Sequence, residues 1–106
     1  MNLFKTLFKT KPKADIKTLV NDGALILDVR TKEEFKTGHI DGSINIPLMD
    51  LGHHLKELKR NEYPVVTVCL TGARSGMACD ILKKNQVIAY DGGGWAALNE
   101  QVNNWL

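Results

Sequence analysis

A cysteine, a glycine and an arginine lie close together in the segment Cys69-Leu70-Thr71-Gly72-Ala73-Arg74-Ser75. The apolar run before it predicts a buried strand over residues 65–68, and the pattern after it predicts a helix over residues 75–84. Small side chains let the loop's backbone N–H groups point inward, and Gly72 permits a turn that other residues resist. With Arg74 and a helix N-terminus beside it, such a loop is an anion cradle. Because a cradle of this kind lowers a thiol pKa, we predict that Cys69 is a reactive thiolate rather than a buried residue that only fills space.

Short apolar runs alternate with helical patterns along the rest of the chain. The runs predict strands over residues 24–27, 43–46, 65–68 and 87–90. The patterns predict helices over residues 16–21, 31–38, 48–59, 75–84 and 95–105, and residues 91–94 predict a tight loop. Strands that are apolar on both faces indicate an α/β fold, a small parallel β-sheet flanked by helices on both faces. Ligands of such folds bind beyond the carboxyl ends of the strands, where Cys69 falls.

Two helix starts carry capping signals. Asp15 is a typical N-cap residue for the helix over residues 16–21. Thr31 and Glu34 have the spacing of a capping box, and Gly38 marks the end of the helix that they open. We therefore expect both helices to begin where these residues stand.

Composition is that of an ordinary globular domain, with 106 residues, 43% of them hydrophobic and 25% charged. We expect two parts, a basic tail over residues 1–13 and one domain over residues 14–106. The formal net charge is +2, but four of the fourteen basic residues precede Asp15, which leaves ten basic against twelve acidic residues in the body. A net-acidic body argues against nucleic acid as a partner.

The two cysteines are too few for a disulfide framework and fit no common zinc pattern. We therefore expect no metal, no cofactor and a reducing, cytoplasmic environment. No secretory signal or membrane-spanning stretch is visible. Cys79 is expected about three helical turns from the loop, so we interpret it as a core residue rather than a disulfide partner of Cys69.

The tail over residues 1–13 has apolar residues on one helical face, with lysines beside them. This pattern is typical of a small helix that contacts a membrane surface or a partner. We favour a frayed tail or a helix folded back on the body, because an isolated helix this short is marginal in water.

Four blocks, in order, make the chain resemble the single-domain rhodanese-like sulfurtransferases over about residues 15–106. They are Leu27-Asp28-Val29-Arg30 with Glu33-Glu34-Phe35, then GHIDGSINIP over residues 38–47, then the cysteine loop, then Gly92-Gly93-Gly94-Trp95. The resemblance implies that Cys69 takes the outer sulfur of thiosulfate or of a persulfide donor. The resulting persulfide would be bound by the backbone amides of Leu70, Thr71, Gly72, Ala73, Arg74 and Ser75. A thiol, a carrier protein such as a thioredoxin, or cyanide in the test tube would then accept the sulfur.

Loop length separates this chain from the phosphatases and arsenate reductases of the same fold. Those relatives use C-x5-R, which fits a tetrahedral oxyanion, whereas this chain has C-x4-R with Ser75 in the next place. Many thiosulfate-using relatives also carry a basic residue directly after the cysteine, where this chain has Leu70. A neutral or protein-bound persulfide donor is therefore plausible, with Leu70 in contact with it. A non-catalytic rhodanese-like module that only binds a partner is the alternative.

Other polar residues of the motifs are interpreted as structural support. By the resemblance, Asp28 and Arg30 brace the fold through polar contacts, and Trp95 walls the entrance or the core. His39 in the GHI turn is expected to be a structural donor. His53 and His54 would point about 100° apart on one helix and form a solvated pair rather than a chelating one.

Overall fold

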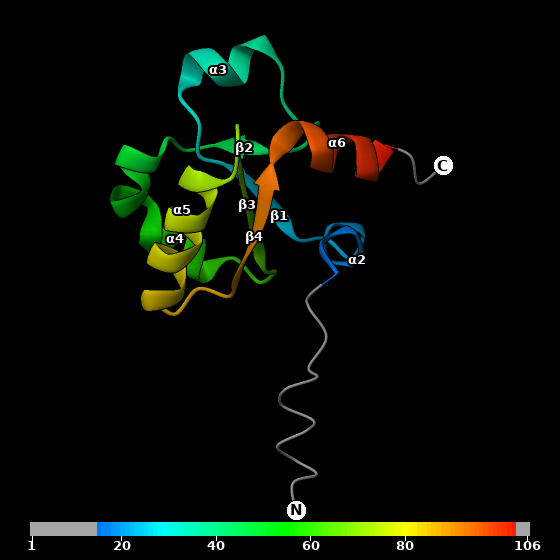
Figure 1. The fold of residues 1–106 in the computed structure, drawn as a ribbon. Helices are drawn as coiled ribbons and strands as arrows, with labels where there is room; N and C mark the ends of the chain where they lie inside the picture. Colours follow the sequence, from blue (N-terminus) through cyan, green and yellow to red (C-terminus); the bar gives the residue numbers. More distant parts are fainter. Residues whose placement is uncertain (1–14, 104–106) are drawn as a thin grey trace, which may run out of the picture.

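The computed structural model describes residues 15–103, so the expectations for the tail over residues 1–13 and for Trp105 lie outside the described residues. Three short elements, α2 (Ile16–Asn21), β1 (Leu25–Asp28) and α3 (Lys32–Thr37), come first. They are followed by β2 (Ile44–Asn45), η1 (Leu48–His54), α4 (Leu55–Arg60), β3 (Val65–Cys69), α5 (Ala73–Lys84), β4 (Ala89–Gly94) and α6 (Trp95–Asn103). Figure 1 shows the strands gathered in the centre, with helices around them.

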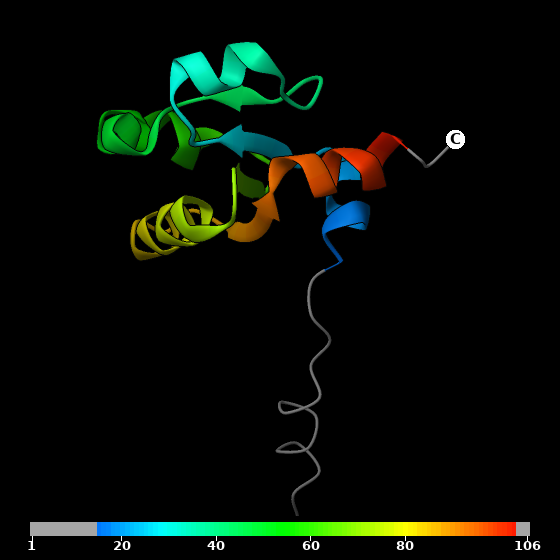
Figure 2. The same cartoon turned by 45° about the horizontal axis from the view of Figure 1, so that its top comes forward.

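The four strands form one parallel sheet in the order β2-β1-β3-β4. Successive residues of β3 pack on opposite sides of it: Val65 lies in one apolar cluster and Val66 in the other. The first cluster includes side chains of η1, α4 and α5, and the second includes side chains of α2 and α6. Figure 2 shows these two groups of helices apart from one another. The predicted α/β fold, a parallel sheet with helices on both faces, is confirmed.

Both predicted helix caps are confirmed. The Asp15 side chain accepts a hydrogen bond from the Thr18 amide at the start of α2. At the start of α3 the Thr31 Oγ1 accepts from the Glu34 amide at 3.1 Å, while Glu34 Oε1 accepts from the Thr31 amide at 2.9 Å. These reciprocal bonds satisfy two donors that would otherwise lack partners at the helix start.

One predicted helix takes a different form. Residues 48–54 are a 3₁₀ helix and only residues 55–60 are α-helical, where the sequence predicted one helix over 48–59. Asp50 and Gly52 are poor α-helix formers, which favours the tighter helix in this first half. Another helix, α5, starts at Ala73, two residues earlier than the predicted start at Ser75. Gly72 acts as its N-cap and adopts a left-handed φ of 109°, which glycine allows.

The predicted tight loop over residues 91–94 is wrong, because β4 continues through Gly94 with an irregularity opposite Thr67 and Cys69. Glycine is required here by close packing. A Cβ on Gly92 would lie 2.7 Å from Val66 Cγ1, and one on Gly94 would lie 3.0 Å from the Leu70 carbonyl oxygen. The glycine run therefore lets β4 lie against β3 and against the start of the cysteine loop.

Candidate active site

Cys69 is the last residue of β3, a central strand, and its side chain lies at the carboxyl edge of the sheet. The loop turns back over it, and the Gly72 amide donates a hydrogen bond to Cys69 Sγ at 2.9 Å. Cys69 has no exposed surface. The loop thus encloses the sulfur, and a reactant must displace part of it to reach Sγ.

Two opposing effects set the pKa of the Cys69 thiol. Burial raises it, because a thiolate loses solvation in the interior. The Ser75 hydroxyl and the amides of Ser75, Gly72 and Thr71 lower it, and together they outweigh burial. The pKa of Cys69 is therefore below its ordinary value, and the thiolate is stabilised by donors of the loop and of the first turn of α5.

Ser75 connects the loop to the middle of β4. It is fully buried, and its Oγ lies 2.9 Å from the Gly72 carbonyl oxygen and 2.7 Å from Asp91 Oδ1. Asp91 Oδ1 also accepts from the Gly93 amide at 2.9 Å. The sequence prediction missed Asp91. Its signal was an acidic residue at the end of the strand predicted before the glycine run, but nothing local placed it beside Ser75.

Arg74 is held by an acidic residue from a distant part of the chain. Its Nη1 and Nη2 donate to Glu34 Oε1 and Oε2 at 2.8 and 3.0 Å. Each residue stabilises the charged form of the other, because this pairing raises the pKa of Arg74 and lowers the pKa of Glu34 to about 2. The sequence predicted that Arg74 contributes a positive charge to the anion cradle, and the structure pairs that charge with Glu34, which lies outside the loop.

A buried ion pair supports the helix that carries Glu34. Arg30 Nη2 donates to Asp28 Oδ2 at 2.7 Å, and both residues are almost completely buried. Arg30 also donates to the carbonyl oxygens of Glu34, within α3, and of Gly38, directly after it. Its guanidinium carbon lies 4.6 Å from the centre of the Trp95 ring. Arg30 therefore connects β1, α3 and α6, and so helps to position Glu34.

The remaining predicted residues lie on the surface of the cysteine loop or just after α3. Thr71 and Ala73 are exposed, and Leu70 is 56% exposed beside Cys69. His39 is also exposed; its Nδ1 lies 2.8 Å from the Phe35 carbonyl oxygen, and its ring stacks on that of Phe35. Within residues 15–103, no three His, Cys, Asp or Glu side chains are grouped so as to hold a metal ion. Both cysteines are free, and burial raises the pKa of Cys79.

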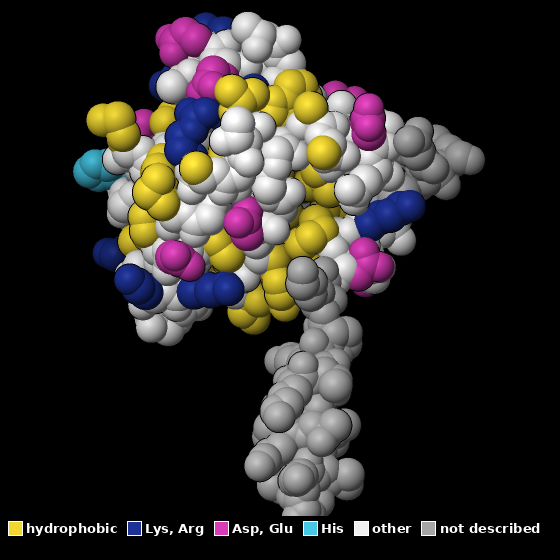
Figure 3. Space-filling view, viewed as in Figure 1, with side chains coloured by type: hydrophobic (Ala, Val, Ile, Leu, Met, Phe, Trp, Pro, Cys, Tyr) yellow, Lys and Arg dark blue, Asp and Glu magenta, His cyan; other side chains and the backbone are white. Residues whose placement is uncertain are grey.

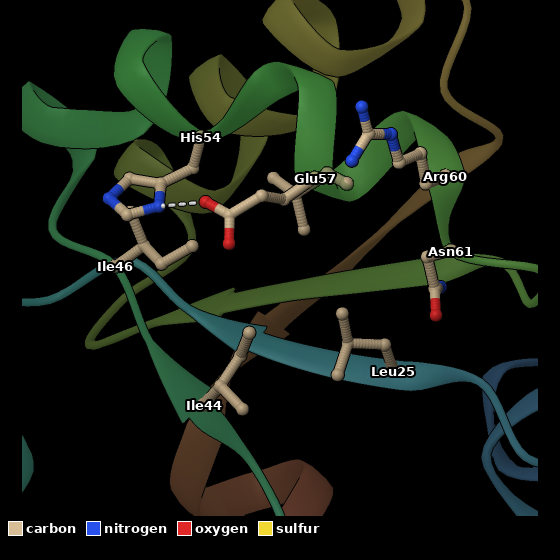
Figure 4. A pocket seen from close by; sticks show the side chains of 8 residues that line it. Leu25, Ile44, Ile46, His54, Glu57, Arg60 and Asn61 are labelled. Carbon is tan, nitrogen blue, oxygen red and sulfur yellow. Dashed lines mark hydrogen bonds and ion pairs between the residues drawn. The ribbon is translucent and has the colours of Figure 1, made fainter.

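A separate pocket lies at the β2 edge of the sheet and contains no residue of the cysteine loop. Apolar side chains of β1 and β2, including Leu25 and Ile44, lie opposite polar residues of η1 and α4 in Figure 4. His54 Nδ1 lies 2.9 Å from Glu57 Oε1 there. No cysteine is among the residues that line this pocket, so it provides no thiol for sulfur chemistry.

On the face shown in Figure 3, side chains of both charges are scattered among apolar ones, without a field of a single sign. In the described part of the chain, none of the helices combines the length and the apolar character that crossing a bilayer requires.

Comparisons with known proteins agree with this geometry. Residues 13–100 match the family described as rhodanese-like domain. The chain is 44% identical over 62 residues to the uncharacterized protein YqhL of Bacillus subtilis, which covers 58% of this chain and 48% of YqhL. It is 30% identical over 91 residues to the thiosulfate sulfurtransferase GlpE of Pseudomonas syringae, over 83% of this chain and 85% of GlpE.

The fold is also that of solved structures. The reduced CoADR-RHD of Bacillus anthracis superposes with a TM-score of 0.70 at 32% identity, over 82% of this chain and 15% of that chain. The chain spans about half the length of YqhL and 15% of the Bacillus anthracis chain, so these two likenesses concern one domain of a longer relative. With the family match running from residue 13 to residue 100 and the same parallel sheet, the chain belongs to the rhodanese-like domain family.

Proposed function

We propose that this protein is a sulfurtransferase that takes sulfane sulfur onto Cys69 as a persulfide and passes it to a thiol acceptor. The observation that carries the proposal is the enclosed sulfur at the end of β3, which receives the Gly72 N–H at 2.9 Å. A sulfur that meets N–H donors and has a lowered pKa is set up to act as a thiolate. The similarity to a protein named thiosulfate sulfurtransferase supports the same chemistry.

In the first step the Cys69 thiolate attacks the outer sulfur of the donor. With thiosulfate, the new bond joins Sγ to that sulfur, the donor's S–S bond breaks, and sulfite leaves with the bonding electron pair. The persulfide keeps a single negative charge, which the loop amides and the positive end of the α5 dipole stabilise.

In the second step a nucleophile removes the outer sulfur and regenerates the thiolate. Cyanide does so in an assay and leaves as thiocyanate; in a cell we propose a thiol, such as that of a thioredoxin-like carrier protein. The two free cysteines fit a reducing, cytoplasmic compartment.

Intact mass spectrometry tests the proposal after incubation with thiosulfate or with an alkyl persulfide, without reductant. We expect one added sulfur atom on the natural chain and on Cys79→Ala, and none on Cys69→Ser. Cys79→Ala is the matched control because it removes the other buried thiol. Added sulfur on Cys69→Ser would show that Cys69 is not the nucleophile. No added sulfur on the natural chain from any donor would favour a module that only binds a partner.

A further inference from the structure

Arg74, which follows the cysteine loop, is paired with Glu34. Arg74 is the second residue of α5, directly after the loop that encloses Cys69. The Glu34 carboxylate is the main cause that raises the pKa of Arg74, and the charge of Cys69 adds to it. Both terminal nitrogens of Arg74 donate to Glu34. Because the two opposite charges lie so close together, their electrostatic effects at the reacting sulfur largely cancel.

Glu34 is in turn fixed in position. Beyond the two bonds from Arg74, Oε1 accepts from the Thr31 amide at 2.9 Å, and the backbone of Glu34 accepts from the buried Arg30. Glu34 and Arg74 are each about 30% exposed, which leaves the pair partly shielded from water. Glu34 therefore cannot turn away from Arg74 without giving up its capping bond, and an arriving anion does not easily displace it.

A thiosulfate dianion would bring a second negative charge to this neutralised site. The loop amides and the α5 N-terminus can stabilise the charge on the reacting sulfur, but the adjoining sulfonate would find no free guanidinium. Leu70 lies directly after Cys69 and is 56% exposed, so the side chain that follows the thiol in the loop is apolar. The site thus suits a donor whose group next to the reacting sulfur is uncharged and carbon-bearing.

We propose that Glu34, by holding Arg74, sets the donor specificity of the loop, so that it accepts organic sulfane-sulfur donors, alkyl persulfides and thiosulfonates, in preference to thiosulfate. This inference rests on the proposed function, since it names the substrate class of the same sulfur transfer. With each of these donors Cys69 attacks the outer sulfur, and the bond between that sulfur and the rest of the donor breaks. An alkyl persulfide releases a thiolate. Thiosulfate releases sulfite with two charges, and methanethiosulfonate releases methanesulfinate with one.

Thiosulfate and methanethiosulfonate form a matched pair, because a methyl group replaces one charged oxygen. The experiment measures kcat/KM for each donor, with cyanide as the common acceptor and thiocyanate as the product. The quantity of interest is the ratio of the thiosulfate value to the methanethiosulfonate value. Differences in intrinsic donor reactivity, and any change in the amount of thiolate, cancel when this ratio is compared between variants.

Glu34→Gln should raise the ratio about threefold to fivefold, the size of one unit charge at a partly exposed site. Leu70→Lys should raise the ratio by a similar factor, because it adds a cation beside the sulfur. This variant keeps the ion pair between Glu34 and Arg74, so it tests the inference even if Glu34→Gln does not fold. Glu33→Gln is the matched control, an exposed carboxylate one residue away in α3; its ratio should equal that of the natural chain.

Unchanged ratios in the folded variants among Glu34→Gln and Leu70→Lys would overturn the inference while leaving the sulfurtransferase in place. A rise of the same size in Glu33→Gln would also overturn it, because the effect would then be general surface charge. No thiocyanate from either donor with the natural chain would overturn the proposed function itself, and this inference with it.

Discussion

Removing the Ser75 hydroxyl should make Cys69 a weaker acid. The Ser75 hydroxyl lowers the pKa of the Cys69 thiol more than the loop amides do, and its Oγ also lies within hydrogen-bond distance of the Gly72 carbonyl oxygen and of Asp91 Oδ1. A hydrogen bond to a charged group contributes about 1.5 kcal/mol or somewhat more, and one pKa unit corresponds to about 1.4 kcal/mol. Ser75→Ala should therefore raise the pKa of Cys69 by about one unit.

The assay is the rate of alkylation of Cys69 by iodoacetamide as a function of pH. Iodoacetamide is uncharged, so the rate follows the fraction of thiolate, and its small size requires only a small displacement of the loop that covers Cys69. Below the pKa the variant should react about tenfold more slowly than the natural chain, since one unit is a factor of ten. At high pH, where both are thiolates, the two rates should converge.

Two controls separate the hydrogen bond from general damage. Ser43→Ala removes another partly buried hydroxyl, one that donates to the Ile40 carbonyl oxygen outside the cysteine loop, and it should leave the profile unchanged. Peptide-level mass spectrometry distinguishes Cys69 from Cys79, whose pKa is raised by burial. Coincident profiles for Ser75→Ala and the natural chain would refute the reasoning and leave the backbone amides as the source of the lowered pKa.

Three further predictions follow from the ion pair and the glycine run. In the same alkylation assay, Arg74→Gln should raise the pKa of Cys69 and Glu34→Gln should lower it. The double variant should have nearly the pKa of the natural chain, and shifts of the same direction in both single variants would contradict a neutral pair. Because the pKa of Glu34 is lowered to about 2, its contribution to stability should be complete above about pH 4.5 and should disappear as the pH falls toward 2. Denaturant unfolding should show Glu34→Gln without this acid-dependent part, and parallel pH profiles would count against it. Gly92→Ala should lower the free energy of unfolding by about 1–3 kcal/mol, since its Cβ would meet Val66 Cγ1 at 2.7 Å. Gly52→Ala, with open space around its Cβ, should be neutral or stabilising, and equal losses in both variants would exclude close packing as the cause.

The element pattern and the position of the thiol could be predicted from the sequence because they depend on neighbours along the chain. The capping bonds of Asp15 and Thr31 join residues three apart, and the apolar runs report burial by their own period. The end of β3 follows from its apolar run, which placed Cys69 at the carboxyl edge of a parallel sheet. The blocks shared with rhodanese-like proteins then indicated the family, which the comparison confirms.

The surroundings of that thiol were decided by the tertiary structure. Arg74 and Glu34 are 40 residues apart, and Ser75 and Asp91 are 16 apart. Each pair meets only because the order of the strands brings their elements together at one edge of the sheet. Local pattern contains no record of such contacts. The sequence alone therefore determined that this chain places a cysteine in an amide-lined loop, and packing between distant segments decided its charge balance.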